Sequence, residues 1–502
     1  MRNTRQRLTS ATNGGPARFL AIFGVAAVAL AIWFLAHQGL PWKLWSGDAC
    51  EYAEMGRRLA TGEGFTTGVI YPAELRFGAG LDKPAVMRPP AWPVALAAVF
   101  TITGPTETAA HALTGALFAG TAALTAALGT ALGGPLVGVF AGIALITTPA
   151  FLGLAMDPVS ETPFAFLVTL AFLLFVRGRP AFAIGLVCGA AYLTRYNGLL
   201  LLPVFAVGLW WPAPRSLRPA LLCCAGFAFV AVPWWIRNLL VSGDPFYSLL
   251  QLNLHFSPHL TDLHDSLYYV LEPDFDSKIA MHPLTKFSKQ LPSLLAGWPL
   301  ASLNLAACAG LLLASVRGHA AALALVALAL GTTFAVALGL PQGRYFVPLL
   351  PATLALGAYG WQRYGSRLAT PGLALILLLP WLPSFPAPRD DLAMLTGYFD
   401  VERHALREDP ERAARERARY EGLRRCLPDR PLVLAQGAAR LVWETGAIAI
   451  YAPNHPTDFW KIVDRYSIDY VQMERWRKID RKRFERGFEP FDDCAADLYR
   501  RR

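Results

Sequence analysis

Residues 19–36 read FLAIFGVAAVALAIWFLA, an unbroken apolar run that follows four arginines in the first 18 residues. About 20 apolar residues are enough for a helix to cross the hydrocarbon core of a bilayer. The basic flank resembles that of a secretory signal peptide, but no small-residue cleavage site precedes Trp42. The run therefore predicts a retained first transmembrane helix with a cytoplasmic N-terminus.

The composition is typical of a protein that crosses the membrane many times. Of the 502 residues, 54% are hydrophobic and 16% are charged. An ordinary soluble enzyme carries roughly 25% charged residues, so that class is excluded, as is a disordered chain. The net charge of +10 is explained by positive cytoplasmic loops without any nucleic-acid partner. The seven cysteines contain no C-x-x-C pair of the kind that binds zinc or works in redox chemistry.

Ten more apolar segments bring the predicted number of transmembrane helices to eleven. Their loops alternate in charge, with arginines at positions 177, 179, 215, 218, 317, 363 and 367 on the side assigned to the cytoplasm. The expected fold is therefore a polytopic α-helical membrane protein. The ten segments are residues 107–130, 135–155, 161–177, 180–195, 197–212, 219–239, 292–314, 319–340, 345–361 and 368–386.

This topology leaves residues 38–106, 156–160, 240–291 and 387–502 outside the cytoplasm. Residues 90–104 are apolar but short and rich in proline, and they predict a juxtamembrane helix within the first of these loops. In the last segment the charge density rises. A polar helix is expected over 401–426, and β-strands over 431–435, 447–451 and 468–473. We expect two domains, a membrane domain over 1–386 and a small α/β domain over 387–502.

The first external loop carries the sequence Trp45-Ser-Gly-Asp48-Ala-Cys-Glu51-Tyr52. Asp48 and Glu51 would share one face of a helix. Gly-Asp before a helical stretch also suits an N-cap, so capping is the alternative to a catalytic role. Downstream, Arg88 comes before Pro89-Pro90 at the expected membrane face, where it would meet an anionic headgroup or serve as an interfacial anchor.

The second external loop contains Asp157 and Glu161, which mark either a hydrated turn or a site. Arginines near the outer ends of helices, among them Arg237 and Arg344, suit a phosphate-bearing substrate. His255 and His259 have the spacing of a zinc pair, although Pro258 lies between them and makes them weak candidates. No nucleotide-binding or zinc-protease motif is present.

These features together resemble the GT-C glycosyltransferases that use polyprenyl-phosphate sugars, the superfamily of protein O-mannosyltransferases and lipid A aminoarabinose transferases. The resemblance rests on seven motifs in order between about residue 45 and residue 350. They are Gly47-Asp48 with Tyr52, Leu59-Ala-Thr-Gly62-Glu-Gly64-Phe65, Arg88-Pro-Pro-Ala-Trp-Pro93, Met156-Asp-Pro-Val-Ser-Glu161, Leu193-Thr-Arg195, Arg237-Asn238 with Gly243-Asp-Pro245, and Arg344-Tyr345 with Pro348 and Pro351. It implies a GT-C-like membrane domain and a sugar donor linked to polyprenyl phosphate.

The resemblance also implies roles for single residues. Asp48 would be the catalytic carboxylate, with Asp157 and Glu161 as the acids of the second loop. Many members of the family have a second acid directly after the catalytic aspartate of the first loop. Here that position is Ala49, so Glu51 is the candidate substitute for the second acid. Arg88 would bind the donor phosphate, with further candidate phosphate ligands at Lys83, Arg237 and Arg344. No cofactor is required, and a divalent metal stays open.

The expected activity is transfer of the sugar, with inversion, to a lipid, glycan or protein acceptor outside a bacterial cytoplasmic membrane. A flippase or transporter of lipid-linked sugars and a polysaccharide polymerase or ligase are the alternatives. Visible repeats and charges near the middle of the bilayer would favour a transporter. Cys426 and Cys494 lie in the segment expected outside, where they could form a disulfide bridge.

Overall fold

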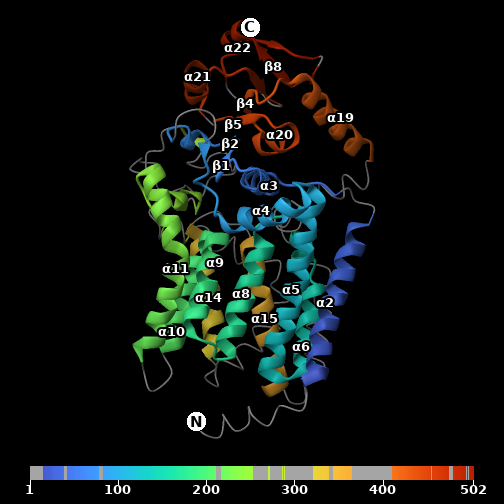
Figure 1. Ribbon diagram of the computed structural model, residues 1–502, viewed down its shortest axis with the longest axis vertical. Coiled ribbons are helices and arrows are strands. Elements are labelled where there is room, and N and C mark those ends of the chain that lie inside the picture. The colour runs from blue at the N-terminus through green and yellow to red at the C-terminus, as the bar shows by residue number, and fades with distance from the viewer. Residues whose placement is uncertain are drawn as a thin grey trace.

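The computed structural model is a bundle of apolar helices with a mixed α/β sheet at one end (Figure 1). The first described helix, α2 (Gly15–His37), starts at the end of the bundle opposite the sheet, and the C-terminus lies at the sheet end. The structure describes residues 15–38, 42–77, 83–210, 216–252, 269–271, 285, 288, 320–338, 343–364, 410–453, 455–473, 479–492, 494–495 and 497–502.

Three described helices are long and apolar enough to cross a membrane: α2 (Gly15–His37), α5 (Glu107–Gly133) and α11 (Leu217–Ser242). The other helices of the bundle are shorter. They are α6 (Pro135–Ile146), α7 (Pro149–Ala155), α8 (Glu161–Val176), α9 (Ala181–Thr194), α10 (Leu201–Trp210), α14 (Ala320–Leu338) and α15 (Leu350–Tyr364). The predicted spans 292–314 and 368–386 lie outside the described residues, so the count of eleven stays a prediction.

Three predicted spans differ in detail from the structure. Span 135–155 is wrong as one helix, because the chain breaks after α6 and restarts at Pro149 as α7. Proline disfavours a helical conformation in the residue before it and lacks the N–H that would continue the ladder. Two further spans open with 3₁₀-helix before the α-helix begins, namely η3 (Tyr196–Leu200) before α10 and η7 (Gly343–Leu349) before α15.

Glycines allow the closest helix packing in the bundle. A Cβ added to Gly185 of α9 would lie 2.0 Å from the backbone oxygen of Cys223 in α11. A Cβ added to Gly226 of α11 would lie 2.2 Å from the oxygen of Phe182. Both distances are far below van der Waals contact. The two helices can therefore approach this closely only because the positions of Gly185 and Gly226 have no side chain.

The first loop folds into two helices and short strands at the sheet end of the bundle. Helix α3 (Gly47–Ala60) packs on α4 (Ala91–Thr103), the predicted juxtamembrane helix. Between them lie β1 (Thr66–Thr67), β2 (Val69–Ile70), the 3₁₀ turn η2 (Pro72–Glu74) and β3 (Lys83–Pro84). Strands β1 and β3 pair antiparallel.

The C-terminal segment forms the expected α/β unit. Its elements are α19 (Pro410–Cys426), β4 (Leu432–Ala435), α20 (Ala438–Thr445), β5 (Ile448–Tyr451), α21 (Pro456–Arg465), β6 (Tyr470–Gln472), α22 (Arg481–Gly487), β7 (Phe488–Pro490) and β8 (Leu498–Arg501). All three predicted strands are present. Cys426 and Cys494 are free thiols that share a hydrogen bond, and their bridge stays a prediction.

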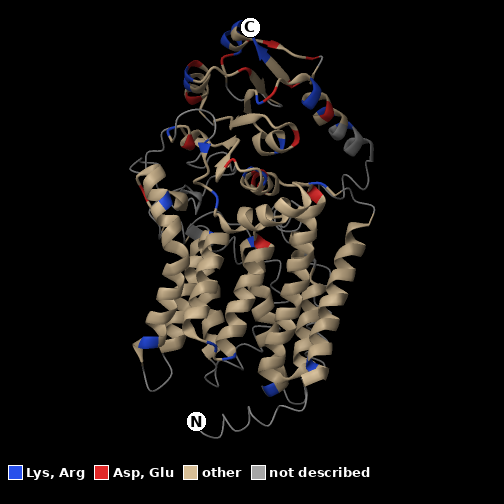
Figure 2. Ribbon diagram, viewed as in Figure 1, with Lys and Arg blue, Asp and Glu red and all other residues tan. Residues whose placement is uncertain are grey.

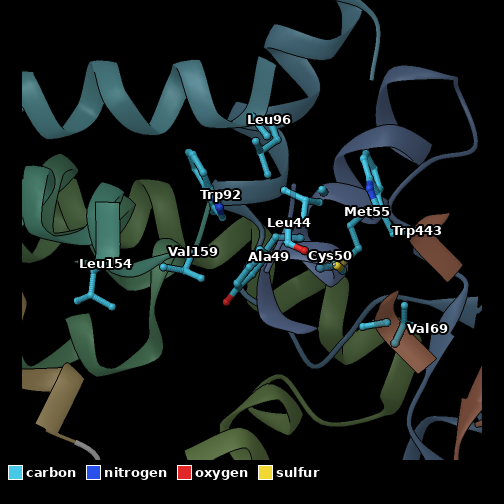
Figure 3. Close-up of a cluster of buried hydrophobic side chains, with 14 of the residues drawn as sticks. Leu44, Ala49, Cys50, Met55, Val69, Trp92, Leu96, Leu154, Val159 and Trp443 are labelled. Carbon is cyan, nitrogen blue, oxygen red and sulfur yellow. Dashed lines mark hydrogen bonds between the residues drawn. The ribbon is translucent and has the colours of Figure 1, made fainter. Parts of the chain in front are cut away.

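Strand β2 of the first loop joins this sheet, which the sequence analysis did not foresee. The strand order is β2-β5-β4-β6-β8-β7, and β2 runs parallel to β5 with Val69 opposite Ala449. A buried apolar cluster fills the space beneath, with side chains from α3, α4, β2 and α20 (Figure 3). Leu44, Met55, Trp92 and Trp443 are among them. The first loop is thus packed between the bundle and the sheet.

Candidate active site

The first turn of α3 presents Asp48 at the sheet end of the bundle. Ser46 is the N-cap, and its Oγ accepts a hydrogen bond from the backbone N–H of Ala49. The capping hypothesis for Asp48 is therefore wrong, because the cap lies two residues earlier. Asp48 is left with its carboxylate free for other partners, and Glu51 lies one turn along the same helix.

Arg88 contacts both acids of this helix face. Its Nη2 lies 2.7 Å from Asp48 Oδ1 and 2.5 Å from Glu51 Oε2, and its Nε donates to Glu51 over 2.9 Å. Tyr71, which follows β2, donates from its hydroxyl to the same Glu51 oxygen over 3.0 Å and accepts from Arg88. The expected face shared by Asp48 and Glu51 is thus realised, and one guanidinium spans it.

A second set of residues reaches Asp48 from the middle of the chain. Glu161, the first residue of α8, pairs with Arg195 over 2.8 Å and with Arg344 over 3.4 Å. Arg344, in η7, also lies 3.2 Å from Asp48 Oδ2. Arg344 therefore bridges the acid of the first loop and the acid of the second. Three arginines and three carboxylates meet here, which we call the acid–arginine cluster: Asp48, Glu51, Glu161, Arg88, Arg195 and Arg344.

The three carboxylates differ in access to solvent. The side chain of Asp48 is 25% exposed, whereas those of Glu51 and Glu161 are 3% and 1% exposed. Burial acts to raise the pKa of Asp48, but the guanidinium groups of Arg88, Arg344 and Arg195 outweigh it and hold that pKa well below its usual range. Burial raises the pKa of Glu51 against the opposing effect of Arg88. Asp48 is thus the ionised, accessible acid of the cluster.

Asp157 is close to the cluster but turns away from it. Its carboxylate accepts from the backbone N–H groups of Trp45 and Ser46, both over 3.0 Å, and from the Ser46 hydroxyl over 2.6 Å. Asp157 and Glu161 are both buried, so the hydrated-turn hypothesis for the second loop is wrong.

Two of the candidate phosphate ligands have other partners. The guanidinium of Arg237 donates to the backbone oxygens of Ala85 over 2.7 Å and Phe65 over 3.1 Å, which ties the β1–β3 hairpin to α11. The ammonium of Lys83 is buried and lies 3.3 Å from the backbone oxygen of Leu75. His255 and His259 lie outside the described residues.

The cluster does not fit a divalent cation. In the part of the chain that the structure describes, no group of three or more His, Cys, Asp or Glu could hold a metal ion. Arg344 lies between Asp48 and Glu161, where a cation bridging the two loops would have to bind, and two more guanidinium groups flank it. The positive charge that such a site would take from a metal is already supplied by arginine.

Two members of the cluster's surroundings were missed from the sequence. Arg195 was one of the arginines near the outer helix ends, which the positive-inside rule disfavours, but it was not selected as a site residue. Tyr71 was not singled out at all. Tyr71 carries no such local signal, because its partners lie 17 and 20 positions away in the sequence.

Known structures of the same architecture complete the description. No protein-family model matches the chain, and no curated protein matches it in sequence. ArnT from Cupriavidus metallidurans bound to undecaprenyl phosphate matches 91% of this chain and 90% of its own, with a TM-score of 0.56 and 16% identity. The chain has the GT-C fold.

The Archaeoglobus fulgidus oligosaccharyltransferase, in complex with zinc and sulfate, supports the same assignment. It matches 89% of this chain and 67% of its own, with a TM-score of 0.54 and 12% identity. The same archaeal enzyme, AglB, in complex with an inhibitory peptide and a dolichol-phosphate, matches with a TM-score of 0.52 and 11% identity. The resemblance drawn from the motifs is therefore confirmed at the level of the GT-C fold.

Proposed function

We propose that this GT-C protein is a membrane glycosyltransferase that moves a sugar from a polyprenyl-phosphate donor to an acceptor. The acid–arginine cluster carries the proposal, because it joins an accessible carboxylate to three guanidinium groups at one end of an apolar bundle. Guanidinium groups recognise phosphate oxygens with paired hydrogen bonds. Two structures with the same fold bind a polyprenyl phosphate, undecaprenyl phosphate in ArnT and dolichol-phosphate in AglB.

The chemistry requires one displacement at the anomeric carbon. The acceptor oxygen forms a bond to that carbon as the bond between the carbon and the phosphate oxygen breaks, which inverts the configuration. The polyprenyl phosphate leaves with the bonding electron pair, and arginine neutralises the charge that develops on it. The acceptor proton passes to the Asp48 carboxylate. No nucleotide takes part in this scheme, because the donor already carries the activated bond.

Binding of the donor would also make Asp48 a better base. Before binding, Arg88 and Arg344 pair with Asp48 and keep its pKa low. A donor phosphate that draws these guanidinium groups toward itself reduces their hold on the carboxylate, so the pKa of Asp48 rises toward the working pH. General bases act best when their pKa is near that pH.

We also propose the arrangement in the membrane. Figure 2 shows Lys and Arg at both ends of the described bundle, and Asp and Glu among the described residues only toward the sheet end. Under the positive-inside rule, the purely basic end faces the cytoplasm of a bacterial cell, together with the N-terminus. Residues 1–386 are then the membrane domain, and residues 387–502 with the site lie outside the cytoplasmic membrane. Labelling from outside at Glu63→Cys but not at Arg363→Cys would support this orientation, and the reverse would overturn it.

The function is tested by mass spectrometry of the glycans and lipids of a strain that lacks the protein. We expect a sugar modification to disappear, to return with the wild-type gene and to stay absent with Asp48→Asn. Asp464→Asn is the matched control, since Asp464 is an exposed acid of α21 that pairs only with Arg483 among the described residues. An unchanged set of glycans and lipids would contradict the proposal.

The same experiment separates the alternatives. If the protein is a flippase, the strain that lacks it would accumulate lipid-linked sugar on one face of the membrane. If it is a polymerase or ligase, that strain would accumulate complete repeat units that are not joined. The flippase gains no support from the described residues, because their charges gather at the ends of the bundle rather than near its middle.

A further inference from the structure

The carboxylate of Asp157 makes three hydrogen bonds that all end on the entry to α3. It accepts from the N–H groups of Trp45 and Ser46 and from the Ser46 hydroxyl, and the residue is 0% exposed. The Ser46 hydroxyl in turn caps α3 through the N–H of Ala49. A buried carboxylate that accepts several hydrogen bonds is well satisfied and has little reason to leave its place.

The turn that carries Asp157 is itself fixed from both sides. The indole N–H of Trp33 in α2 donates to the backbone oxygen of Ala155 over 2.8 Å, and that of Trp92 in α4 donates to the oxygen of Pro158 over 2.9 Å. Both indoles are buried. Asp157 therefore lies in a rigid turn held by two different helices. Through its hydrogen bonds to Trp45 and Ser46, Asp157 fixes the first residues of α3 relative to that turn.

The same turn leads directly into Glu161, which begins α8 and binds Arg344. Arg344 also binds Asp48 in the first turn of α3. The turn thus fixes one acid of the cluster by its backbone and the other through the Asp157–Ser46 contact. A shift of α3 relative to α8 would separate Asp48 from Arg344, and a misplacement of about 1 Å can cost on the order of 10²-fold in rate.

We infer that Asp157 is a positioning residue, which sets the Asp48 carboxylate against Arg344 and Glu161 through the Ser46 cap and touches no reacting group. This inference rests on the proposed glycosyltransferase function for its kinetic consequences. It gives Asp157 a different task from the catalytic role expected of an acid in the second loop. The charged form is needed because three donors point at it, whereas an amide offers one oxygen and a competing N–H group.

A double-mutant cycle tests the inference, with undecaprenyl-phosphate sugar turnover measured for Asp157→Asn, Ser46→Ala and the double variant. We expect Asp157→Asn to lower kcat by on the order of 10-fold or more. Ser46→Ala should lower it by less, because the N–H groups of Trp45 and Ser46 still bind the carboxylate. The double variant should be no slower than Asp157→Asn alone, because both changes break one connection. The pH–rate profile should keep its number of ionisations, since Asp157 does not titrate in the reaction, while the apparent pKa of Asp48 rises as the carboxylate moves away from Arg344.

Effects that multiply in the double variant, or an ionisation lost from the pH–rate profile of Asp157→Asn, would overturn the inference in favour of direct chemistry. If Asp157→Asn does not fold, Ser46→Ala still tests the inference, since it keeps the carboxylate and its two backbone N–H donors and removes the hydroxyl that joins Asp157 to the cap of α3. A wild-type kcat in Ser46→Ala would then contradict the inference.

Amide hydrogen exchange supplies a test that needs no substrate. In purified Asp157→Asn protein, the amides of residues 45–50 should exchange faster than in wild type. Asp244→Asn is the control, because Asp244 accepts from the N–H of Phe246 in an exposed turn that follows α11. Faster exchange without any detectable sugar transfer by the wild type would keep the positioning role and refute the proposed function. Sugar transfer with unchanged exchange would do the opposite.

Discussion

Helix α3 carries two acid–arginine groups that differ in how they are built. At its start, Asp48 and Glu51 pair with Arg88 from beyond β3, and Asp48 also pairs with Arg344. Further along, Glu54 pairs with Arg58 on the same helix and accepts from the backbone N–H of Gly68. The Glu54 side chain is 0% exposed and that of Asp48 is 25% exposed.

The two groups on α3 differ in the origin of their arginines and in their access to solvent. The pair formed by Glu54 and Arg58 is local, closed and completed by a neighbouring backbone group, so it fixes the β1–β2 segment against α3. The acid–arginine cluster draws its arginines from three distant segments and leaves Asp48 partly accessible. Bringing like charges together from far apart is costly unless opposite charges or ligands compensate. We therefore interpret the acid–arginine cluster as the candidate site, and the pair of Glu54 and Arg58 as a contact that stabilises the fold.

The largest expected effect comes from the local pair. Glu54→Gln removes the buried carboxylate that pairs with the Arg58 guanidinium, and removal of one partner of a buried pair costs about 3–5 kcal/mol. We expect a clear fall in the thermal midpoint of the purified protein, with turnover per folded molecule close to wild type. A stable Glu54→Gln protein with lost turnover would place this pair in the site.

The opposite pattern is expected at the start of the helix. Asp48→Asn keeps the shape of the side chain but removes its charge and its capacity to take a proton, so turnover should fall by at least about 10²-fold. The thermal midpoint should fall by less than in Glu54→Gln, because Asp48 is the most accessible acid of the cluster and its ion pairs with Arg88 and Arg344 are closer to solvent. Turnover near the wild-type value in well-folded Asp48→Asn protein would remove Asp48 from the catalytic role.

Exchanging each arginine for lysine compares the two groups directly. Arg88→Lys keeps the charge but loses the fork that spans Asp48 and Glu51, so binding of undecaprenyl phosphate should weaken by roughly 10-fold. Arg58→Lys should leave that binding unchanged, since Arg58 is turned toward Glu54 and Glu63. Equal losses in both variants, measured by titration of the purified proteins, would mean that Arg88 only supports the fold.

A third buried acid gives the smallest effect. Glu74 accepts from the N–H groups of Tyr71, Val86 and Met87, and so holds the segments that carry Tyr71 and Arg88. Burial raises the pKa of Glu74 from 4.5 to about 8. A raised pKa means that the folded state binds this proton more tightly than the unfolded chain does, so the protonated form stabilises the fold below pH 4.5 and that stabilisation is lost as the pH rises through 8.

The side chain in Glu74→Gln cannot ionise, so this variant does not lose stability in the way the wild type does. As the pH rises from 5 to 9, the thermal midpoint of Glu74→Gln should rise by a few degrees relative to that of the wild type. Melting curves at these pH values provide the measurement. Glu421→Gln changes an exposed acid of α19 and should follow the wild type throughout. A gap between Glu74→Gln and wild type that stays constant with pH would show that the carboxyl group titrates normally.

Much of this fold could be predicted from local sequence, and the limits have a physical cause. The apolar runs gave α2, α5 and α11, and the C-terminal β-type runs gave β4, β5 and β6, because periodicity and burial act within each segment. Of the acids and arginines expected at the site, the cluster contains Asp48, Glu51, Glu161, Arg88 and Arg344. Asp157, Arg237 and Lys83 bind backbone groups instead, and a backbone partner leaves no trace in the sequence of the side chain that finds it.

The pairing of β2 with β5 has a consequence for the time at which the protein becomes complete. Val69 lies opposite Ala449, so the strand next to Tyr71 has to wait for its partner until nearly the whole chain has been made. At roughly 5–20 residues per second, the interval between the two strands is on the order of 20–80 s. During that interval the first loop has an unpaired edge and an unfinished support for Tyr71. A chain whose synthesis ends before residue 448 would therefore form a helical bundle in the membrane without the sheet that packs on the first loop.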